Sequence, residues 1–312
     1  MKTYSANGKL LLTGEYLVLQ GALALALPTK LGQSMTVTAT KGLAMTEWNA
    51  YRPLGDPWFS ATFDKDFDVL STDDRPKAEK LSQILEAVKE LNPNAFEKGL
   101  RFETHLGFDP EWGLGSSSTL ISNLARWAEV NPYELLRRTF GGSGYDIACA
   151  TAATPIHYQL KQGEPLVQPV DFHPDFAENL YFVYQGKKQN SSKEVKRFSS
   201  QVKDTDLEKD VEAVSEISRA LPKTTSLAAF QQLLEEHEAM LSHRLGRATI
   251  QTQFPDFEGT LKSLGAWGGD FFLAATRWPS SQVHEYFHQK GLDIIFNYND
   301  LQHAELLDSR CL

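Results

Sequence analysis

The sequence is poor in cysteine, with only Cys149 and Cys311 in 312 residues. Two cysteines do not build a disulfide framework, so we expect thiols in a reducing, cytoplasmic setting. Long apolar runs are also missing, because the stretch from Leu23 to Leu27 is far shorter than the roughly 20 residues of a membrane span. The first residues show no cleavable targeting pattern. These absences predict a protein that carries no targeting signal and is not embedded in a membrane.

An excess of positive charge is missing as well. The formal net charge is −9, which argues against a broad nucleic-acid surface and predicts no nucleic-acid partner. A local basic pocket for a phosphorylated ligand stays compatible with that balance, because net charge says little about one cleft. With 41% hydrophobic and 23% charged residues, the composition is that of an ordinary globular protein of one large or two smaller domains.

Three common nucleotide or nucleophile motifs are absent. A Walker loop needs Gly-Lys followed by Ser or Thr, and no such tripeptide occurs. A dinucleotide fingerprint would need glycine where Ser118 stands. A hydrolase elbow starting at Gly141 fails because its fifth residue is Tyr145.

Short apolar runs and helical periodicities alternate along the chain. Over the first 40 residues, glycine and proline punctuation predicts successive strands joined by tight turns, at 10–12, 16–19, 23–27 and 35–37. Further strands are expected at 59–63, 100–106, 156–160, 180–184 and 292–296. Helical spacing is found over 78–91, 119–130, 132–138 and much of 192–246. This mixture predicts an α+β protein, with a composition shift near 161–180 as the domain boundary.

One glycine-serine turn has the composition of a phosphate-binding loop. Its residues are Gly113, Leu114, Gly115, Ser116, Ser117 and Ser118, and a helix is expected directly after them. Glycine allows the backbone to approach an anion closely, and a helix N-terminus adds its positive dipole end. The serine hydroxyls can bind phosphate oxygens or Mg²⁺. The plainer alternative is a serine-capped helix.

Four separated segments resemble the motifs of the GHMP kinase superfamily. Residues 8–19 resemble the N-terminal motif, and 109–118 resemble the phosphate loop P-x-x-x-G-L-G-S-S-A. Residues 142–148 resemble the segment with the catalytic aspartate, and 265–270 resemble the C-terminal glycine loop. The segments lie in family order. They depart from it at Ser118, which replaces alanine, at Trp267, which replaces glycine, and in the shortened spacing after Pro110.

The resemblance implies a two-lobed α+β GHMP kinase fold. A mixed β/α lobe over residues 1–165 would bind ATP, and a ferredoxin-like α/β lobe would cover 166–312. It implies phosphoryl transfer from ATP with Mg²⁺. The regulator alternative, a non-catalytic nucleotide- or metabolite-binding protein, stays open, although Lys9 and Asp146 argue against it.

Within the superfamily, the chain is most similar to the phosphomevalonate kinase branch. Mevalonate kinases carry Gly-Glu-His where this chain has Gly14, Glu15 and Tyr16. The Gly-Tyr-Asp-Ile-Ala string at 144–148 resembles a bacterial subgroup. The expected acceptor is phosphomevalonate, with mevalonate as the alternative. Homoserine or a sugar stays open, as do a monomer and a homodimer.

The resemblance also assigns roles to single residues. Asp146 would orient the attacking oxygen or accept its proton, unless it merely caps a helix. Lys9 would stabilise the transferring phosphoryl group or keep Asp146 ionised, unless it is a solvated strand-edge lysine. Mg²⁺ would be held by Ser117 and Glu134, although Glu134 equally suits a solvated helix face.

The remaining assignments concern the acceptor. Expected acceptor ligands are Glu15, Tyr16, Ser143, Gly144, Lys187, Ser191, Ser192, Gly268 and Gly269. Glu15 and Tyr16 suit a structural role equally well, and Lys187 also suits a charged surface loop. His237 and His243 lie six residues apart, which is not zinc-site spacing, and are expected on the surface or in the packing of a helix.

Overall fold

The computed structural model describes residues 2–40, 45–202 and 207–302, and the chain forms two compact units. The first unit contains residues up to 8, then 31–110 and 114–151. The second contains 9–30, 111–113 and the chain from 152 onward. The division at 165/166 stays a prediction. Cys149 is buried, and Cys311 lies outside the described residues.

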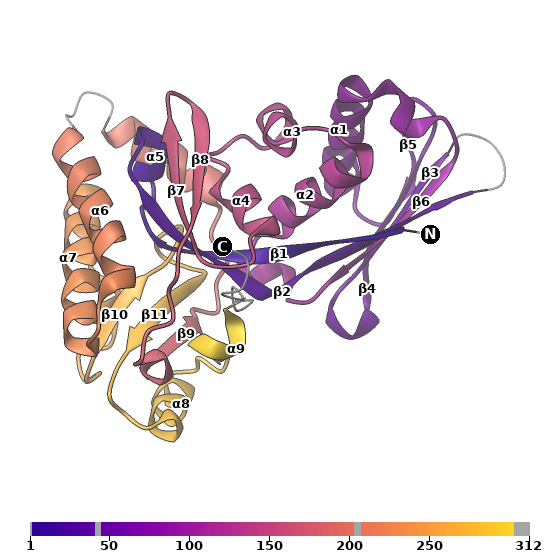
Figure 1. Ribbon diagram of the computed structural model, residues 1–312. Coiled ribbons are helices and arrows are strands. Elements are labelled where there is room, and N and C mark those ends of the chain that lie inside the picture. The colour runs from indigo at the N-terminus through magenta and orange to yellow at the C-terminus, as the bar shows by residue number, and fades with distance from the viewer. Residues whose placement is uncertain (1, 41–44, 203–206, 303–312) are drawn as a thin grey trace, which may run out of the picture. The chain divides into compact units, whose positions relative to one another are not determined.

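The strands and helices follow one another in mixed order (Figure 1). The strands are β1 (Lys2–Thr13), β2 (Ala24–Ala39), β3 (Thr46–Tyr51), β4 (Pro57–Phe63), β5 (Val69–Thr72), β6 (Leu100–Leu106), β7 (Ile156–Lys161), β8 (Glu164–Pro169), β9 (Leu180–Tyr184), β10 (Thr260–Ser263), β11 (Phe271–Ala275) and β12 (Ile295–Asn297). The α-helices are α1 (Arg75–Leu91), α2 (Ser116–Ala128), α3 (Pro132–Thr139), α4 (Tyr145–Thr151), α5 (Ser191–Gln201), α6 (Glu208–Ala220), α7 (Leu227–Leu245), α8 (Ser280–Gln289) and α9 (Tyr298–Leu301).

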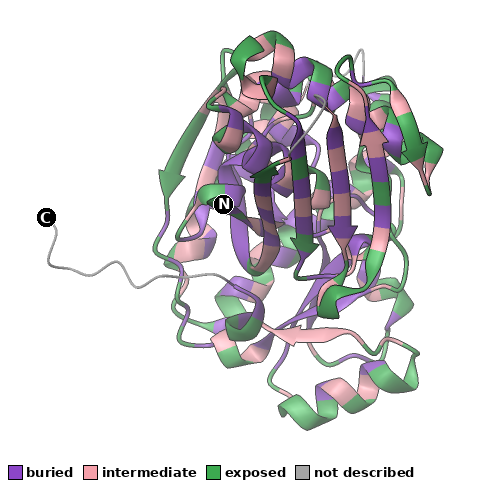
Figure 2. Ribbon diagram, turned by 90° about the vertical axis from the view of Figure 1, so that its right-hand side faces the viewer, coloured by how far each residue is buried: buried purple, intermediate pink, exposed green. Residues whose placement is uncertain are grey.

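The first unit is built on a mixed sheet. Its strand order is β5-β4-β3-β6-β2, where β3 and β6 run parallel and the other neighbours run antiparallel. Along β3, buried and half-buried residues alternate, as the banding of the strands in Figure 2 illustrates. A strand with one face in the core shows this period of two. The buried face of the sheet therefore points to the helices of the same unit.

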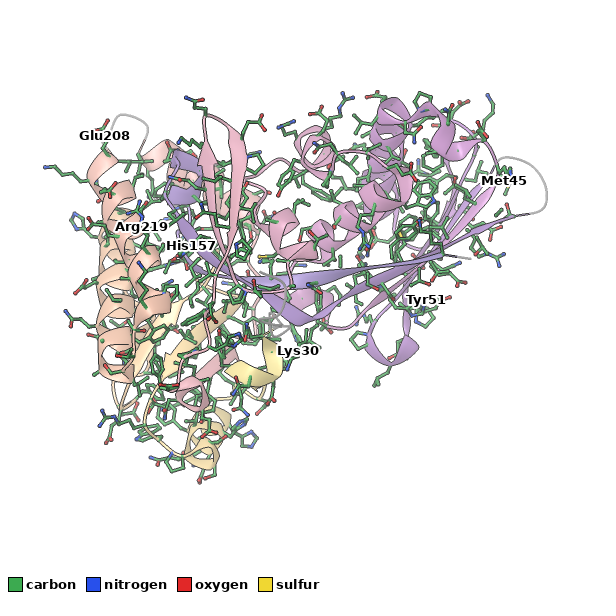
Figure 3. The ribbon with its side chains drawn as sticks, in the orientation of Figure 1. Lys30, Met45, Tyr51, His157, Glu208 and Arg219 are labelled. Atoms are coloured by element: carbon green, nitrogen blue, oxygen red, sulfur yellow. The ribbon has the colours of Figure 1, made fainter. Side chains whose placement is uncertain are left out.

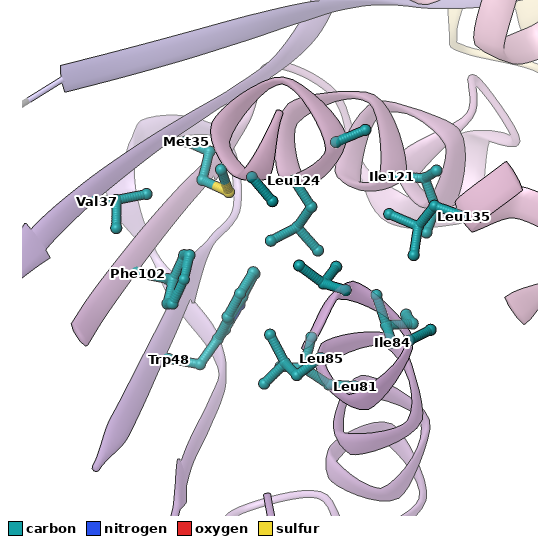
Figure 4. Close-up of a cluster of buried hydrophobic side chains, with 14 of the residues drawn as sticks. Met35, Val37, Trp48, Leu81, Ile84, Leu85, Phe102, Ile121, Leu124 and Leu135 are labelled. Atoms are coloured by element: carbon teal, nitrogen blue, oxygen red, sulfur yellow. The ribbon is translucent and has the colours of Figure 1, made fainter. Parts of the chain in front are cut away.

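Helices α1 and α2 bury their apolar sides against that sheet (Figure 4). Trp48 and Phe102 come from the parallel strand pair and stack with ring centroids 4.9 Å apart. Leu81 and Leu85 of α1 and Leu124 of α2 pack into the same cluster. The core thus fixes α2, the helix that follows the glycine-serine turn.

The second unit has an antiparallel sheet of its own, in the order β10-β11-β9-β12. Helix α8 packs Val283 and Phe287 into a cluster with Val183 and Phe272 of this sheet. Helix α7 packs against β10. The sheet therefore carries the third glycine cluster, at 265–269, between two adjacent strands.

A hairpin of β7 and β8 also belongs to the second unit and pairs with residues 24–26 of β2. Its inner strand contacts helix α6: the Nε2 atom of His157 lies 2.8 Å from the Ser218 carbonyl oxygen. Figure 3 labels His157 and, on α6, Arg219. Burial lowers the pKa of His157 below its ordinary value.

Two sequence-based predictions near the N-terminus are wrong. The expected strand at 16–19 is a 3-10 helix, Leu17–Gln20, because Gly14, Tyr16 and Gly21 take positive φ and turn the chain. The expected strands at 23–27 and 35–37 form one strand, β2, which runs through Gly32 without a turn. A side chain at Gly32 would collide with the Ala6 carbonyl oxygen, since a Cβ would lie 2.1 Å from it.

The predicted α+β class is confirmed. Strands β3, β5, β8, β10 and β11 were not predicted, and the expected helix at 119 begins at Ser116 instead. Across the described ranges, no helix is long and apolar enough to cross a membrane.

Candidate active site

The glycine-serine turn leads into α2 with its backbone amides uncapped. Gly115 is the N-cap residue, with φ 98° and ψ 40°, and no side chain caps the helix there. The first four N–H groups of a helix lack partners inside it and form a natural anion site. Ser117 is exposed at this end, whereas the buried Ser118 hydroxyl donates to the Gly115 carbonyl oxygen at 2.9 Å. This terminus is therefore open to an anion.

Helix α4 packs against α2 in the same unit and carries Asp146. Asp146 is the second residue of α4, so it lies within the first turn instead of capping it. Its Oδ1 atom accepts a hydrogen bond from the Ile147 amide at 3.1 Å. Ser143 and Gly144 directly precede this helix, and Gly144 accepts the amide hydrogen of Ala148 at 3.1 Å.

Glu134 is held by arginines of its own helix. One carboxylate oxygen lies 2.6 Å from Arg137 Nη2, and the other lies 2.9 Å from Arg138 Nε. These hydrogen bonds and charges lower the pKa of Glu134. A Mg²⁺ ion would have to displace both arginines, so the predicted metal role has a strong competitor. Among the described residues, no three His, Cys, Asp or Glu side chains form a metal-sized group.

In the second unit, Lys9 lies against the start of the glycine-serine turn. Its Nζ donates to the Gly113 carbonyl oxygen at 2.7 Å. The carboxylate of Asp270 borders the same glycine, since a Cβ built on Gly113 would lie 2.5 Å from Oδ1 of Asp270. The structure therefore brings together residues that are more than 100 positions apart in the sequence.

The third glycine cluster is joined to the loop that follows β9. Gln185 Nε2 donates to the Gly269 carbonyl oxygen at 2.8 Å, and Gln189 Nε2 donates to that of Gly268 at 2.8 Å. A side chain at Gly269 would collide with the Lys187 carbonyl oxygen, 2.5 Å from a built Cβ. The two predicted acceptor segments, 187–192 and 268–269, are therefore neighbours.

This loop ends at the N-terminus of α5. Asn190 caps the helix by accepting the Lys193 amide hydrogen at 3.0 Å. Lys187, Ser191 and Ser192 are exposed beside the cap. Arg247 connects α5 to the third glycine cluster, with Nη2 2.7 Å from Glu194 Oε2 and Nη1 2.9 Å from the Trp267 carbonyl oxygen.

Glu15 is buried instead of facing a pocket. It is 1% exposed, and its Oε1 lies 2.5 Å from Nζ of the fully buried Lys262. His237 Nε2 lies 3.3 Å from the other oxygen and accepts the Gly14 amide hydrogen at 3.1 Å. Burial raises the pKa of Glu15 to about 7, while Lys262 opposes the shift. Burial also holds the pKa of His237 well below its ordinary value.

Tyr16 is likewise packed inside the second unit. Its ring stacks on Phe198 with centroids 5.1 Å apart, and its hydroxyl accepts the Trp267 amide hydrogen at 3.0 Å. Burial raises the pKa of Tyr16 to about 12. The structure thus places Glu15 and Tyr16 in the framework that supports the third glycine cluster, and their acceptor role stays a prediction.

Sequence reasoning missed several members of this framework. Lys262 and Arg247 stand in no recognisable motif, and Gln189 lies in the 184–192 segment without a role of its own. Asp270 closes the third glycine cluster, and its position directly after two glycines was the one signal that could have singled it out.

No family model and no curated protein matches the sequence. Solved structures do match over nearly the whole chain. L. major mevalonate kinase in complex with R-mevalonate is 14% identical, covers 98% of this chain and 97% of its own, and has a TM-score of 0.68. Streptococcus pneumoniae phosphomevalonate kinase in complex with phosphomevalonate and AMPPNP is 15% identical, with coverages of 95% and 99% and a TM-score of 0.69.

A sugar kinase matches equally well. Lactococcus lactis galactokinase complexed with galactose is 13% identical, covers 97% of this chain and 94% of its own, and has a TM-score of 0.68. Mevalonate, phosphomevalonate and galactose kinases thus share one architecture with this chain. The protein has the two-lobed α+β fold of the GHMP kinases.

Proposed function

We propose that the protein is an ATP-dependent kinase that phosphorylates a small acceptor of the mevalonate pathway, with phosphomevalonate as the first candidate. The uncapped N-terminus of α2 carries this proposal. It presents amides after Gly115 with no competing side-chain cap, in a helix that packs against the one bearing Asp146. Phosphoryl transfer needs both a site that binds the phosphates and a carboxylate that orients the acceptor.

Different residues of the chain would bind the nucleotide, orient the acceptor and neutralise charge. Amides of the α2 N-terminus, with Ser116 and Ser117, would hold the nucleotide phosphates. Asp146 would orient the attacking oxygen, and proton removal matters little if the acceptor is already a phosphate. Lys9 would neutralise charge that develops on the transferring group.

Mg²⁺ bound with ATP would supply further charge neutralisation between the phosphates. Mg²⁺ usually keeps several waters and takes few protein ligands. The exposed Ser117 hydroxyl at the helix end therefore fits such an ion without a carboxylate cage.

The segment at the start of α5 favours a phosphorylated acceptor over mevalonate itself. Lys187 and Lys188 are exposed just before the N-terminus of α5, an eleven-residue helix that begins with two serines. Lysines bind phosphate as point charges, and helix amides add donors. Mevalonate lacks the phosphate that this cluster would hold.

An ADP-release assay against four acceptors tests the proposal. The purified chain is mixed with ATP and Mg²⁺ and either phosphomevalonate, mevalonate, homoserine or galactose, and the product is identified by mass. We expect ADP release with phosphomevalonate and a product heavier by one phosphoryl group. Turnover with another acceptor would refute the substrate assignment. Nucleotide binding without turnover on any acceptor would favour a non-catalytic regulator.

A further inference from the structure

Asp270 has a role that none of the assignments above includes. Its φ is 54°, in the left-handed region that aspartate enters more readily than most residues. Its amide donates to the Lys187 carbonyl oxygen at 2.7 Å, and its own carbonyl accepts the Gln185 amide hydrogen at 2.8 Å. The main chain at Asp270 is therefore fixed on both sides by the loop after β9.

The side chain of Asp270 is fixed as well. It is 7% exposed, and its Oδ1 accepts the Gln189 amide hydrogen at 3.0 Å. A Cβ on Gly113 would lie 2.5 Å from both Cγ and Oδ1 and 2.7 Å from Oδ2. The carboxylate thus fills the space where any side chain at position 113 would stand.

Lys9 completes the cluster by donating to the carbonyl oxygen of that same glycine at 2.7 Å. Burial raises the pKa of the Asp270 carboxyl, and the positive charges of Lys9 and Lys188 oppose that shift. A buried carboxylate stays ionised only beside a cation. The charge of Lys9 therefore helps to keep the Asp270 carboxylate ionised.

The segment that carries Gly113 is anchored to the same sheet. Tyr184 of β9 donates its hydroxyl hydrogen to the Glu111 carbonyl oxygen at 2.9 Å. Trp112 packs edge-on against Phe296 of β12 with centroids 5.4 Å apart. Since Asp270 directly precedes β11 of this sheet, both sides of the cluster rest on one rigid element.

We propose that Asp270 is a positioning residue for the phosphoryl transfer: its carboxylate fixes the Gly113 backbone and attracts the Lys9 ammonium, which donates to that backbone. This inference rests on the proposed function. Groups held in place before the reaction cost no reorganisation when charge develops, so the effect belongs to the transition state. Asp270 acts through Lys9 and Gly113 without touching the substrates.

Asp270→Asn tests the inference, because it keeps the size and the acceptor for Gln189 while removing the charge. We expect kcat to fall at least about tenfold with the nucleotide KM within about threefold. When Lys9 is already replaced by Met, adding Asp270→Asn should lower kcat further by less than about twofold. Asp175→Asn, at an exposed carboxylate of the same unit, serves as control and should leave kcat unchanged.

An equal loss of kcat from Asp270→Asn in both backgrounds, or no loss in the parent, overturns the proposal. The parent, the two single variants Asp270→Asn and Lys9→Met, and their double variant also provide a test without turnover. Thermal unfolding without ligand should show midpoint shifts for the two single variants that are not additive in the double variant. Additive shifts overturn the pairing. If no acceptor is phosphorylated, the proposed function fails, and this thermal cycle still decides whether the pair exists.

A second set of variants covers the case in which Asp270→Asn does not fold. Gly113→Ala adds a methyl group that collides with the carboxylate, and Asp270→Gly removes the collision. We expect Gly113→Ala to reduce the melting temperature by less in the Asp270→Gly background than in the parent. Equal reductions would show that the carboxylate does not constrain Gly113.

Discussion

At the scale of the residue, Asp146 combines a local and a chemical role. Its Oδ1 accepts the Ile147 amide hydrogen, which asparagine can also do. We therefore predict that Asp146→Asn folds with a melting temperature within a few degrees of the parent, while kcat falls by about 10²–10⁴-fold because the charge that orients the acceptor is lost. Steady-state ADP release and thermal unfolding measure the two effects. Near-normal turnover would remove Asp146 from the mechanism.

The buried pair of Glu15 and Lys262 predicts a pH dependence of stability. Because the folded-state pKa of Glu15 is raised to about 7 from 4.5, the folded protein binds this proton more tightly than the unfolded chain. The stability that this proton contributes is complete below pH 4.5 and is lost as pH rises through 7, up to about 3 kcal/mol. Relative to Glu15→Gln, the parent should therefore lose stability between pH 5 and pH 8.

Urea unfolding at several pH values measures this difference. Neighbouring groups make the comparison with Glu15→Gln necessary. His237, whose pKa is lowered, destabilises the fold as pH falls, which is the opposite direction. Glu238, whose pKa is raised by burial, acts in the same direction as Glu15. Parallel stability curves for parent and variant would show that Glu15 does not titrate in this range.

Single residues were predictable where a motif carries them. Lys9, Asp146 and the serines at 116–118 lie in recognisable local patterns. Lys262 does not, and its partner Glu15 lies more than 200 positions away. Asp270 lies in the 265–270 motif, but its contact with Gly113, more than 150 positions away, could not be read from that motif. Pairing over such separations follows from the packing of strands, which no local pattern encodes.

At the scale of the element, the left-handed turn at Gly115 positions the α2 N-terminus. Gly115→Ala should cost about 1–2 kcal/mol of stability, because an L-residue is strained at φ 98°. It should also raise the nucleotide KM at least about tenfold, since the amides that meet the phosphate shift. Melting temperatures and KM values for ATP and acceptor measure both effects.

Gly163→Ala is the matched control for that prediction. Gly163 has φ 82° in the β7–β8 turn, with no atom within 4 Å of a built Cβ. It should reproduce the loss of stability while the nucleotide KM stays unchanged. An equal rise in KM for both variants would mean that general destabilisation, not the phosphate turn, sets nucleotide affinity.

Removing a positive charge from the loop that leads into α5 should weaken binding of the acceptor and not of ATP. Lys187→Ala should raise the KM for the phosphorylated acceptor several-fold, about 1 kcal/mol or more, while the KM for ATP changes little. As a control, Lys196→Ala removes an exposed lysine from α5 itself and should change neither KM. A larger rise in the ATP KM than in the acceptor KM would assign this loop to the nucleotide.

Elements were predictable where periodicity was long. Helix α1 shows clear helical spacing and an Asp74 cap, so the expected 78–91 differs from Arg75–Leu91 only at its start. Strands of four residues, such as β5 and β10, are too short to show a period. The 3-10 helix Leu17–Gln20 has apolar residues suited to a strand, and the flanking positive-φ residues decide its geometry.

At the scale of the whole molecule, motif order was more informative than composition. The four segments from residue 8 to residue 270 pointed to the fold that the solved kinase structures share at 13–15% identity. Those structures include kinases for mevalonate, phosphomevalonate and galactose, so the architecture is common to different acceptors. The acceptor therefore stays a prediction, and the ADP-release assay tests it.

Nucleotide binding by the protein can be measured separately from turnover. A ligand that binds only the folded state at 100 times its Kd stabilises the protein by about 2.7 kcal/mol. A non-hydrolysable ATP analogue with Mg²⁺ should therefore raise the melting temperature by several degrees, and EDTA should reduce the shift because Mg²⁺ neutralises the phosphates. Gly115→Ala should abolish most of it, while Lys187→Ala should preserve it. An unchanged melting temperature in the parent at saturating analogue would contradict nucleotide binding and, with it, both the kinase and the nucleotide-regulator proposals.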